Sequence, residues 1–380
     1  MMTLPVTVII PTFNRADFIS ACLESILGQT CPPQQIIVVD DGSTDKTGEV
    51  ISHFSKVEYI RKSNGGKSSA INAALPLLKG EYVWIMDDDD IALPDALNQL
   101  LKPHLNNPQL GYSFGYQIAA KIVGETITPI TPERRMPSYF DPLLHRYRLT
   151  EYNYFSLNSC LIRYRTFIET GKFDERLVRS QDYDFLLRLS IKAKVAYIDK
   201  HIYWLREHSG MRGSEMNPIQ FQDRNQAWIK YDRIVGKKVL DTYSDDAFIH
   251  PNLESYSSAE RFRSCKLRRA YIAASKGLVE EAENYLHAVH SFDDPAKLPN
   301  LNEIDRVTLM QIFGEIDFLK AVREDPAFRE KIFTSIASIP GANPKKMLLK
   351  RLYWNARLAF SKGRIMDGVD YVRDFSKALT

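Results

Sequence analysis

Residues 82–90 read YVWIMDDDD, an apolar run of strand-forming residues that ends in four aspartates. Four adjacent carboxylates repel one another unless a cation offsets their charge. Residues i and i+2 of a strand point the same way, so we expect Asp87 and Asp89 to reach one ion together. All-oxygen ligands suit Mg²⁺ or Mn²⁺, which proteins often hold through carboxylates and substrate phosphates. The alternative is a solvated acidic turn that caps a helix beginning near Pro94.

Three more strand patterns precede this one, and helix patterns alternate with them. The strands are expected at 6–10, 36–39, 57–61 and 81–86, and the helices at 16–28, 45–54 and 67–79. This order predicts an α/β fold with a doubly wound, mostly parallel sheet, in which ligands bind beyond the carboxyl ends of the strands. Polar residues stand at those ends: Thr12 and Arg15 after the first strand, Asp40 and Asp41 after the second, and Asp87–Asp90 after the fourth.

Downstream we expect two more strands, at about 157–163 and 195–205, and a helix at 182–192 between them. Residues 120–150 are rich in proline and include Arg134-Arg135, which predicts an irregular loop facing the substrate. Past residue 215 we expect only helices, with two similar segments, AASKG at 273–277 and AFSKG at 359–363, each placing a glycine at a helix end. This is typical of tetratricopeptide-like hairpins, although a stable array needs three or more copies. We therefore expect an α/β domain at 1–215 and a helical domain at 216–380.

Composition narrows the class of protein. The chain has 380 residues, 44% hydrophobic and 26% charged, as is ordinary for a globular protein, and a net charge of +3 that does not favour nucleic acid. No apolar run is long enough to span a bilayer, and the strand pattern begins so early that we expect no signal peptide. Four scattered cysteines favour a reduced, cytoplasmic protein.

The first half of the chain resembles a known family. The motifs are PTFNR at 11–15, VDDGSTD at 39–45, NGGK at 64–67, MDDDD at 86–90, GKFDE at 171–175, QDYD at 181–184 and REH at 206–208. Their order and spacing are similar to those of family 2 glycosyltransferases of the GT-A fold, over roughly residues 5–215. The resemblance implies an inverting enzyme that moves a sugar from a nucleotide-sugar, a UDP-sugar most of all, to an acceptor hydroxyl. The helical half is not covered.

Several residues would hold the donor. Asp40 is able to accept a hydrogen bond from a ring N–H, and the resemblance implies that it reads the base. Pro11, Thr12 and Arg15 on the neighbouring loop would contact the base or ribose. Lys67 opens a helix after two glycines, and a helix N-terminus attracts anions, so Lys67 would meet a phosphate or the nucleoside. The alternatives are a tight turn with a helix cap at 40–45, which we favour for Asp41, Ser43 and Asp45, and an ordinary glycine turn at 64–67.

The aspartates take separate roles under the resemblance. Asp89 would ligate the metal, and Asp87 would touch the ribose or reach the metal through water. Asp88 joins the donor contacts, while Asp90 is able to cap the next helix instead. His208 would be a further metal ligand, or else a lone surface histidine, and Arg206 would pair with phosphate.

The resemblance places the catalytic carboxylate at Asp182, as the base for the acceptor hydroxyl. Gln181 stands where the family usually has Glu, so any role that needs a charge at that position is in doubt. The alternative is that Asp182 only caps its helix. Asp184 faces another way on the same helix and is expected to be structural.

The helical half has no motif, yet residues 345–364 form a basic, aromatic helix pattern. Lys346, Lys350, Arg357 and Arg364 share one stripe and Leu348, Leu352 and Ala359 another. Such a helix would rest on an anionic membrane, at the inner face of the cell membrane, or pack one face on a core and leave the other solvated. The helical domain would hold a saccharide or lipid-linked acceptor, or pair two subunits as a homodimer.

Two other functions remain open. A sugar-phosphate nucleotidyltransferase has a related sheet but needs a Gly-rich, Arg-bearing loop after the first strand, where this chain has residues 11–15. The second is a catalytically inactive protein that binds a nucleotide-sugar or acts as a scaffold. Gln181 in place of the usual Glu would then be the first sign that catalytic residues have been lost.

Overall fold

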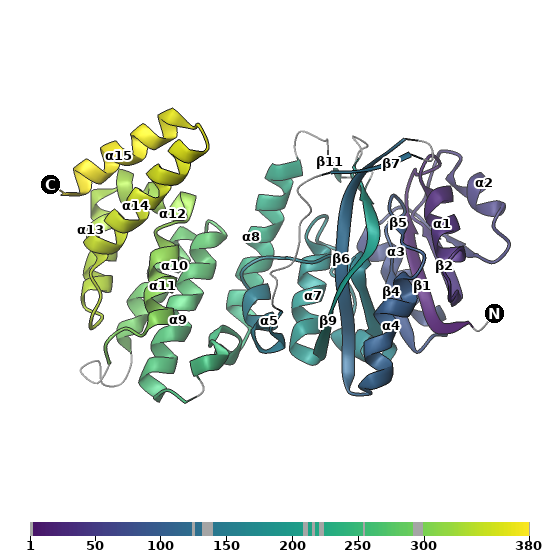
Figure 1. The fold of residues 1–380 in the computed structure, drawn as a ribbon, viewed down its shortest axis with the longest axis horizontal. Coiled ribbons are helices and arrows are strands. Elements are labelled where there is room, and N and C mark those ends of the chain that lie inside the picture. The colour runs from purple at the N-terminus through teal and green to yellow at the C-terminus, as the bar shows by residue number, and fades with distance from the viewer. Residues whose placement is uncertain are drawn as a thin grey trace. The chain divides into compact units, whose positions relative to one another are not determined.

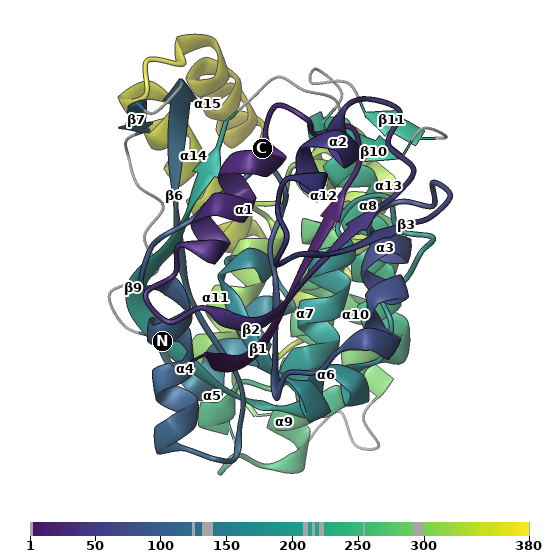
Figure 2. The same cartoon turned by 90° about the vertical axis from the view of Figure 1, so that its right-hand side faces the viewer.

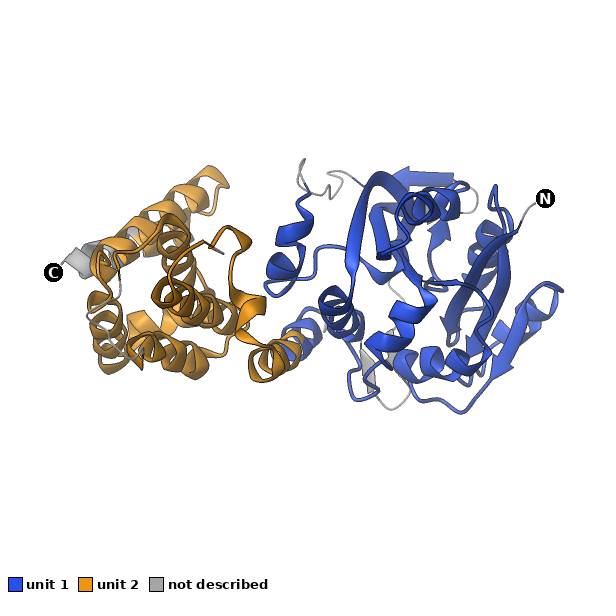
Figure 3. Ribbon diagram, turned by 90° about the horizontal axis from the view of Figure 1, so that it is seen from below, with its two compact units in different colours: residues 1–231 blue, residues 232–380 orange. Residues whose placement is uncertain are grey.

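The chain divides into two compact units, residues 1–231 and residues 232–380 (Figure 3). The structure is a computed structural model that describes residues 3–123, 126–130, 140–207, 212–214, 217–219, 224–253, 255–291 and 299–379. Two predictions, the metal ligand His208 and the loop pair Arg134-Arg135, lie outside the described residues.

Unit 1 is built on one mixed sheet. Its strands run in the order β3-β2-β1-β4-β8-β6-β9-β5, with β7 paired to β6. Their bounds are β1 (Leu4–Thr12), β2 (Pro33–Asp40), β3 (Glu58–Arg61), β4 (Tyr82–Ile85), β5 (Ile91–Ala92), β6 (Leu110–Val123), β7 (Thr126–Pro129), β8 (Cys160–Arg163) and β9 (Lys194–Arg206). A hairpin of β10 (Arg212–Ser214) and β11 (Asn217–Ile219) is separate from this sheet. Strand β11 corrects the expectation that only helices follow residue 215.

The four strands expected at 6–10, 36–39, 57–61 and 81–86 are β1 to β4, and they pair in parallel. Beyond β4 the sheet is mixed, because β8 runs antiparallel to both β4 and β6, while β6 and β9 pair in parallel. The parallel order puts the carboxyl ends of β1, β2 and β4 at one edge. The predicted α/β sheet followed by a helical region is therefore confirmed.

Helices cover both faces of this sheet. The helices of unit 1 are α1 (Ile19–Leu27), α2 (Thr47–Ser52), α3 (Lys67–Ala74), α4 (Ala96–Asn106), α5 (Pro142–Leu149), α6 (Tyr164–Thr170) and α7 (Gln181–Lys192). Val6, Val8 and Ile10 pack with α1 and α4 in one core, whereas the alternate residue Ile9 is buried on the opposite face. Figure 2 shows α1 and α4 on one side of β1 and β2, and α3 and α6 on the other. Burial on both faces explains the continuous apolar runs of these strands.

The described part of the segment 120–150 is more regular than predicted. The end of β6, the strand β7 and the helix α5 fill most of its described part. Asp141 caps α5 by accepting a hydrogen bond from the Leu143 N–H at 2.9 Å, and Pro142 occupies the first helical position. Proline is favoured at that position, so Pro142 begins a helix rather than interrupting one.

Unit 2 is all helical in its described part. Its helices are α8 (Arg224–Thr242), in which the division from unit 1 falls, α9 (Ser258–Ser275), α10 (Val279–Ala288), α11 (Glu303–Ile312), α12 (Ile316–Glu324), α13 (Pro326–Ala337), α14 (Pro344–Ser361) and α15 (Ile365–Leu379) (Figure 1). The buried guanidinium of Arg263 on α9 binds the Asp305 carboxylate of α11 at 2.7 Å. Among the described residues, no helix is long and apolar enough to cross a bilayer.

The two similar segments end their helices in the same way. Gly277 has φ 68° and Gly363 has φ 69°, a left-handed conformation that favours glycine. Leu278 N–H donates to the Ala273 carbonyl and Arg364 N–H to the Ala359 carbonyl, both at 2.9 Å. This Schellman pattern confirms the predicted helix ends. Kinship with tetratricopeptide hairpins stays a prediction.

Candidate functional site

Three strand ends converge at one edge of the sheet. Thr12, the last residue of β1, pairs in register with Asp40, the last residue of β2. On the other side of β1, β4 ends at Ile85, and the Met86 N–H donates to the Ile9 carbonyl at 3.0 Å. The loops that follow these strands therefore start side by side, as the sequence predicted. Pro11 is a buried strand residue paired with Val39.

The loops after β1 and β2 are bonded together. Asn14 has a left-handed backbone, φ 52°, which asparagine tolerates better than most residues. Its N–H donates to the Ser43 hydroxyl at 2.9 Å, and its side-chain oxygen accepts from the Thr44 N–H at 2.8 Å. The Arg15 N–H donates to the Thr47 hydroxyl at 2.8 Å. These bonds fix the backbone of Arg15 beside the loop that follows β2.

Asp40 is almost fully buried and bonded on both carboxylate oxygens. One oxygen accepts from the Ser43 N–H at 2.7 Å and the other from the Tyr59 hydroxyl at 2.6 Å. Burial and the Asp40 carboxylate raise the pKa of Tyr59 to about 12. Each carboxylate oxygen has a second lone pair, so Asp40 is still able to accept from a ligand. Tyr59 was not predicted from the sequence, because it lies on β3 and its partner Asp40 lies on β2.

Asp41 shapes the glycine loop instead. Its carboxylate accepts from the Lys62 ammonium at 2.7 Å, from the Gly65 N–H at 3.0 Å and from the Gly66 N–H at 2.6 Å. Gly66 has φ 88°, which an L side chain rarely adopts, and it directly precedes α3. Asp41 therefore sets the position of Lys67, the first residue of that helix.

We expect the Asp41→Asn variant to lose about 2 kcal/mol of unfolding free energy, because hydrogen bonds to a charged group contribute roughly 1.5–3 kcal/mol each. An amide keeps the shape but loses the charge that Lys62 faces. Chemical denaturation measures the change. The matched control is Asp17→Asn, at an exposed position, where we expect a change within about 0.5 kcal/mol. An equal effect of the two substitutions would contradict the role of Asp41.

The four aspartates occupy a turn, which corrects the strand geometry assumed from the sequence. Strand β4 ends at Ile85, so the alternation argument does not apply to the cluster. The turn nevertheless brings carboxylate oxygens of Asp87, Asp89 and Asp90 within 4.8 Å of one another. Sequence reasoning placed Asp87 and Asp89 together but left Asp90 out of this group.

Asp90 bonds the turn to two neighbouring segments of the chain. One of its oxygens accepts from the Arg206 N–H at 3.0 Å and the other from the Asn158 amide at 2.8 Å. It does not cap α4, whose N-cap is Asp95. Burial and the charges of Asp89 and Asp87 raise the pKa of Asp90 well above its ordinary value.

Asp88 and Asp89 face Arg15. The Arg15 Nε lies 3.5 Å from an Asp88 oxygen and 4.0 Å from an Asp89 oxygen. Burial and the charge of Asp89 raise the pKa of Asp88 to about 7, although Arg15 and the Thr12 hydroxyl oppose the shift. The cluster therefore holds more negative charge than its neighbours neutralise, which is the condition that a bound cation relieves.

Lys67 binds the aspartate turn and is also influenced by the charge of Asp182. Its ammonium binds the Asp87 carboxylate. Burial would lower the pKa of Lys67, but Asp87, Asp182 and Asp89 together hold it above its ordinary value. Asp182 thus acts electrostatically on the group that binds the aspartate turn, although 95 residues separate it from Asp87 in sequence.

Asp182 lies in the first turn of α7, after an unusual residue. Ser180 has φ 57°, a left-handed conformation that costs energy outside glycine. Gln181 is buried, and its side-chain oxygen accepts no hydrogen bond from any described residue. Asp184 pairs with Arg188 at 2.9 Å, which agrees with the structural role expected of it.

Arg206 ends β9 beside the turn. Its guanidinium carbon lies 5.2 Å from the centre of the Phe18 ring. The side chain is buried, and its Nε and one terminal nitrogen donate to none of the described residues. Because a buried guanidinium has a strong need for acceptors, this side chain is suited to an anionic ligand.

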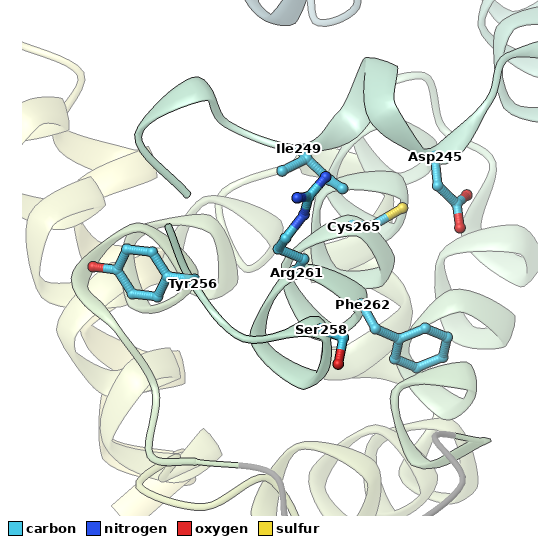
Figure 4. Close-up of a pocket in the computed structure, with 7 residues that line it drawn as sticks. All are labelled: Asp245, Ile249, Tyr256, Ser258, Arg261, Phe262 and Cys265. Atoms are coloured by element: carbon cyan, nitrogen blue, oxygen red, sulfur yellow. The ribbon is translucent and has the colours of Figure 1, made fainter. Parts of the chain in front are cut away.

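A pocket of about 330 Å³ lies elsewhere, in unit 2 (Figure 4). It contains none of the predicted site residues. Its Asp245 binds Arg269 at 2.8 Å, and the neighbouring Asp246 lies 3.6 Å from Arg261. These charges are already paired within the chain. The residues that line it are Asp245, Ile249, Tyr256, Ser258, Arg261, Phe262 and Cys265.

Comparisons with known proteins converge on one family. Residues 7–167 match the family model described as Glycosyl transferase family 2. Chondroitin synthase of Pasteurella multocida (strain Pm70) is 27% identical over 254 residues, which are 64% of this chain and 24% of that protein. Hyaluronan synthase of Pasteurella multocida is 30% identical over 209 residues, which are 52% of this chain and 20% of that protein. The chain thus matches only a quarter or less of the length of these relatives.

A solved structure shares the fold. The structure of S. aureus TarS 1-349 in complex with UDP-GlcNAc aligns with a TM-score of 0.51 and 16% identity, over 99% of this chain and 92% of that one. Identity this low shows the fold alone, which is the GT-A type sheet followed by helices that the sequence predicted.

Proposed function

Because the chain belongs to glycosyltransferase family 2 through residues 7–167, we propose that it transfers a sugar from a nucleotide-sugar to an acceptor hydroxyl, with inversion at the anomeric carbon. The donor is a UDP-sugar and the acceptor a saccharide or a lipid-linked glycan, in the synthesis of a polysaccharide. The names of the relatives, two polysaccharide synthases, and a neighbour bound to UDP-GlcNAc support this choice.

One observation carries the proposal. The aspartate turn is crowded with negative charge, lies between Arg15 and Lys67, and acts on the same lysine as Asp182. A diphosphate donor needs cations around it, and an acceptor hydroxyl needs a base nearby. The site offers both at one edge of the sheet, where α/β proteins bind ligands.

The donor would lie along this edge. Asp40 accepts from the ring N–H of the base while it keeps its bonds to Ser43 and Tyr59. Pro11 and Thr12 border the same part of the site at the end of β1. Lys67 exchanges Asp87 for a phosphate oxygen, and Arg206 supplies the donors that none of the described residues uses.

The residues of the turn fit a divalent cation. Asp87, Asp89 and Asp90 offer only oxygen ligands within reach of one another, which suits Mn²⁺ or Mg²⁺. Asp87 and Asp89 would hold the ion, and Asp90, already bonded by Arg206 and Asn158, would orient the turn. The ion would offset the charge that develops on the leaving diphosphate.

Asp182 is the base in this proposal. Its carboxylate takes the proton of the acceptor hydroxyl as that oxygen forms a bond to the anomeric carbon. The bond from the anomeric carbon to the diphosphate oxygen breaks on the opposite face. The side-chain oxygen of Gln181 accepts from none of the described residues and would accept a hydrogen bond from the acceptor, without adding charge to a crowded site.

A thermal-shift screen tests the donor. We expect one UDP-sugar to raise the melting temperature with Mn²⁺ or Mg²⁺ far more than without, and GDP- and dTDP-sugars to raise it less. At a ligand concentration of about 100 times Kd the gain is about 2.7 kcal/mol, which is on the order of 5 °C or more for a domain of this size. No shift with any nucleotide-sugar and either ion would contradict the proposal.

Release of UDP from the donor, measured on the same protein, distinguishes an active transferase from a protein that only binds the donor. We expect the chain to release UDP slowly from its donor with Mn²⁺, since water is able to replace the acceptor. An inactive nucleotide-sugar-binding protein would show the thermal shift and release no UDP.

A further inference from the structure

The basic residues of unit 2 are concentrated on one helix. Residues 344–364, which are α14 and the turn after it, contain seven Lys or Arg and no Asp or Glu. Residues 232–343 contain 18 acidic and 15 basic residues. The rest of the unit is thus slightly acidic, while α14 carries a positive charge that no acidic residue of its own segment offsets.

One face of α14 is part of the core of unit 2. Its buried residues are Pro344, Met347, Leu348, Leu352, Ala356 and Ala359. This confirms the apolar stripe that the sequence predicted through Leu348, Leu352 and Ala359. Folding therefore uses this face, and the basic face is left to solvent.

The outward face mixes cations with large apolar side chains. Tyr353 is 54% exposed, Trp354 49% and Leu358 49%. Between them stand the exposed residues Lys346, Lys350 and Arg357. The Arg357 guanidinium lies 5.5 Å from the centre of the Trp354 ring, so aromatic and charged groups are in contact rather than on separate faces. We call Lys346, Lys350, Tyr353, Trp354, Arg357 and Leu358 the outer face.

Helix α15 follows α14 and packs beside it (Figure 1). Ile365, Met366 and Val369 are all exposed, directly after the basic turn at 362–364. The Phe360 ring packs so closely on Gly368 that a Cβ there would lie 2.6 Å from it. The two helices are therefore held together, and the exposed apolar residues Ile365 and Met366 follow the basic turn directly, where Arg364 pairs with Asp367 at 3.6 Å.

We propose that the outer face of α14, with the start of α15, docks on the surface of an anionic lipid bilayer. Tryptophan and tyrosine favour the level of the lipid headgroups, and Lys and Arg on the same face attract anionic lipids. One face of α14 is buried in the core of unit 2, so only the outer face is available to lipid. This proposal does not rest on the proposed function, because lipid binding is measured without donor or acceptor.

A second copy of the chain is a poorer occupant of this surface. A two-fold symmetric interface brings the same face of both subunits together. Here it would place two clusters of Lys and Arg against each other with no acidic residue of 344–364 between them. An anionic membrane offers the complementary charge instead.

Vesicle flotation with the full chain tests the proposal. We expect binding to vesicles of phosphatidylcholine with 30% phosphatidylglycerol, little binding to phosphatidylcholine alone, and release in 0.5 M salt. Each Lys or Arg near an anionic membrane contributes about fivefold to partitioning. Lys346→Glu, Lys350→Glu and Arg357→Glu together should therefore lower it by on the order of a hundredfold or more. Trp354→Ser with Leu358→Ser should lower binding while every charge is kept.

The matched control moves the same charge change to another part of unit 2. Lys320→Glu, Arg323→Glu and Lys331→Glu lie on α12 and α13, and we expect them to leave vesicle binding within a few fold of the unchanged chain. Circular dichroism melting confirms that each variant is folded. Equal losses for both triple variants, or equal binding to neutral and anionic vesicles, would overturn the proposal. So would a folded Trp354→Ser, Leu358→Ser variant that changes the oligomeric state in solution and leaves vesicle binding unchanged.

Discussion

The Asp89→Ala variant is expected to lose transfer by a factor of at least about a thousand. A metal that stabilises the charge on a leaving group lowers the barrier by several kcal/mol, and about 4 kcal/mol is a thousandfold in rate. Asp89 is buried, lies 4.0 Å from Arg15 and belongs to the group whose ligand atoms converge. Removal of its carboxylate leaves the turn too little charge to hold the ion. The rate of UDP release with acceptor present measures the loss.

Donor binding gives a second, independent measurement of the same site. In the unchanged chain we expect Mn²⁺ to increase the thermal shift caused by the donor, and in Asp89→Ala we expect this increase to vanish. Asp95→Asn is the matched control, because Asp95 lies in the same loop region but bonds Thr30 and Gln99 outside the cluster. It should keep both transfer and the metal effect. Unchanged turnover in Asp89→Ala would exclude Asp89 as a ligand.

The sequence predicted the part of the fold that depends on local pattern. Apolar runs such as 6–10 and 36–39 belong to strands buried on both faces. Burial on both faces requires nearly every residue of the run to be apolar, so the strands are visible in the sequence. The order of strands and helices predicted a parallel sheet. Parallel strands bring their carboxyl ends to one edge, so the polar residues after these strands were predicted to lie together. Strand β8 pairs with β4 across more than seventy residues of chain, and no local pattern carries that pairing.

The site shows the same division. The charge cluster predicted that Asp87 and Asp89 lie together, which the structure shows, although the strand geometry assumed for them was wrong. Asp90 joined the group only because a turn, rather than a strand, follows Ile85. Tyr59 binds Asp40 from β3, and Asn158 binds Asp90 from the segment before β8. Such partners depend on tertiary contacts, which a single sequence does not display.

The Asp182→Asn variant is expected to lose transfer by a factor of about a hundred to ten thousand while it keeps its donor. That range is the usual contribution of a positioned general base, because an amide is unable to take the acceptor proton. Donor binding should survive, since Asp87 and Asp89 remain to hold the charge of Lys67 when Asp182 is neutral. Turnover with acceptor, together with the metal-dependent thermal shift, measures both parts.

This combination separates the two carboxylates by their roles. Asp89→Ala should lose turnover and the metal effect together, whereas Asp182→Asn should lose turnover alone. Asp184→Asn is the matched control on the same helix: its carboxylate pairs with Arg188, so its replacement should lower the melting temperature and leave turnover of the folded protein intact. If Asp182→Asn transferred sugar at the normal rate, the base would have to be another group. Gln181 could not be that group, because it is a neutral amide at the position where the family usually has Glu.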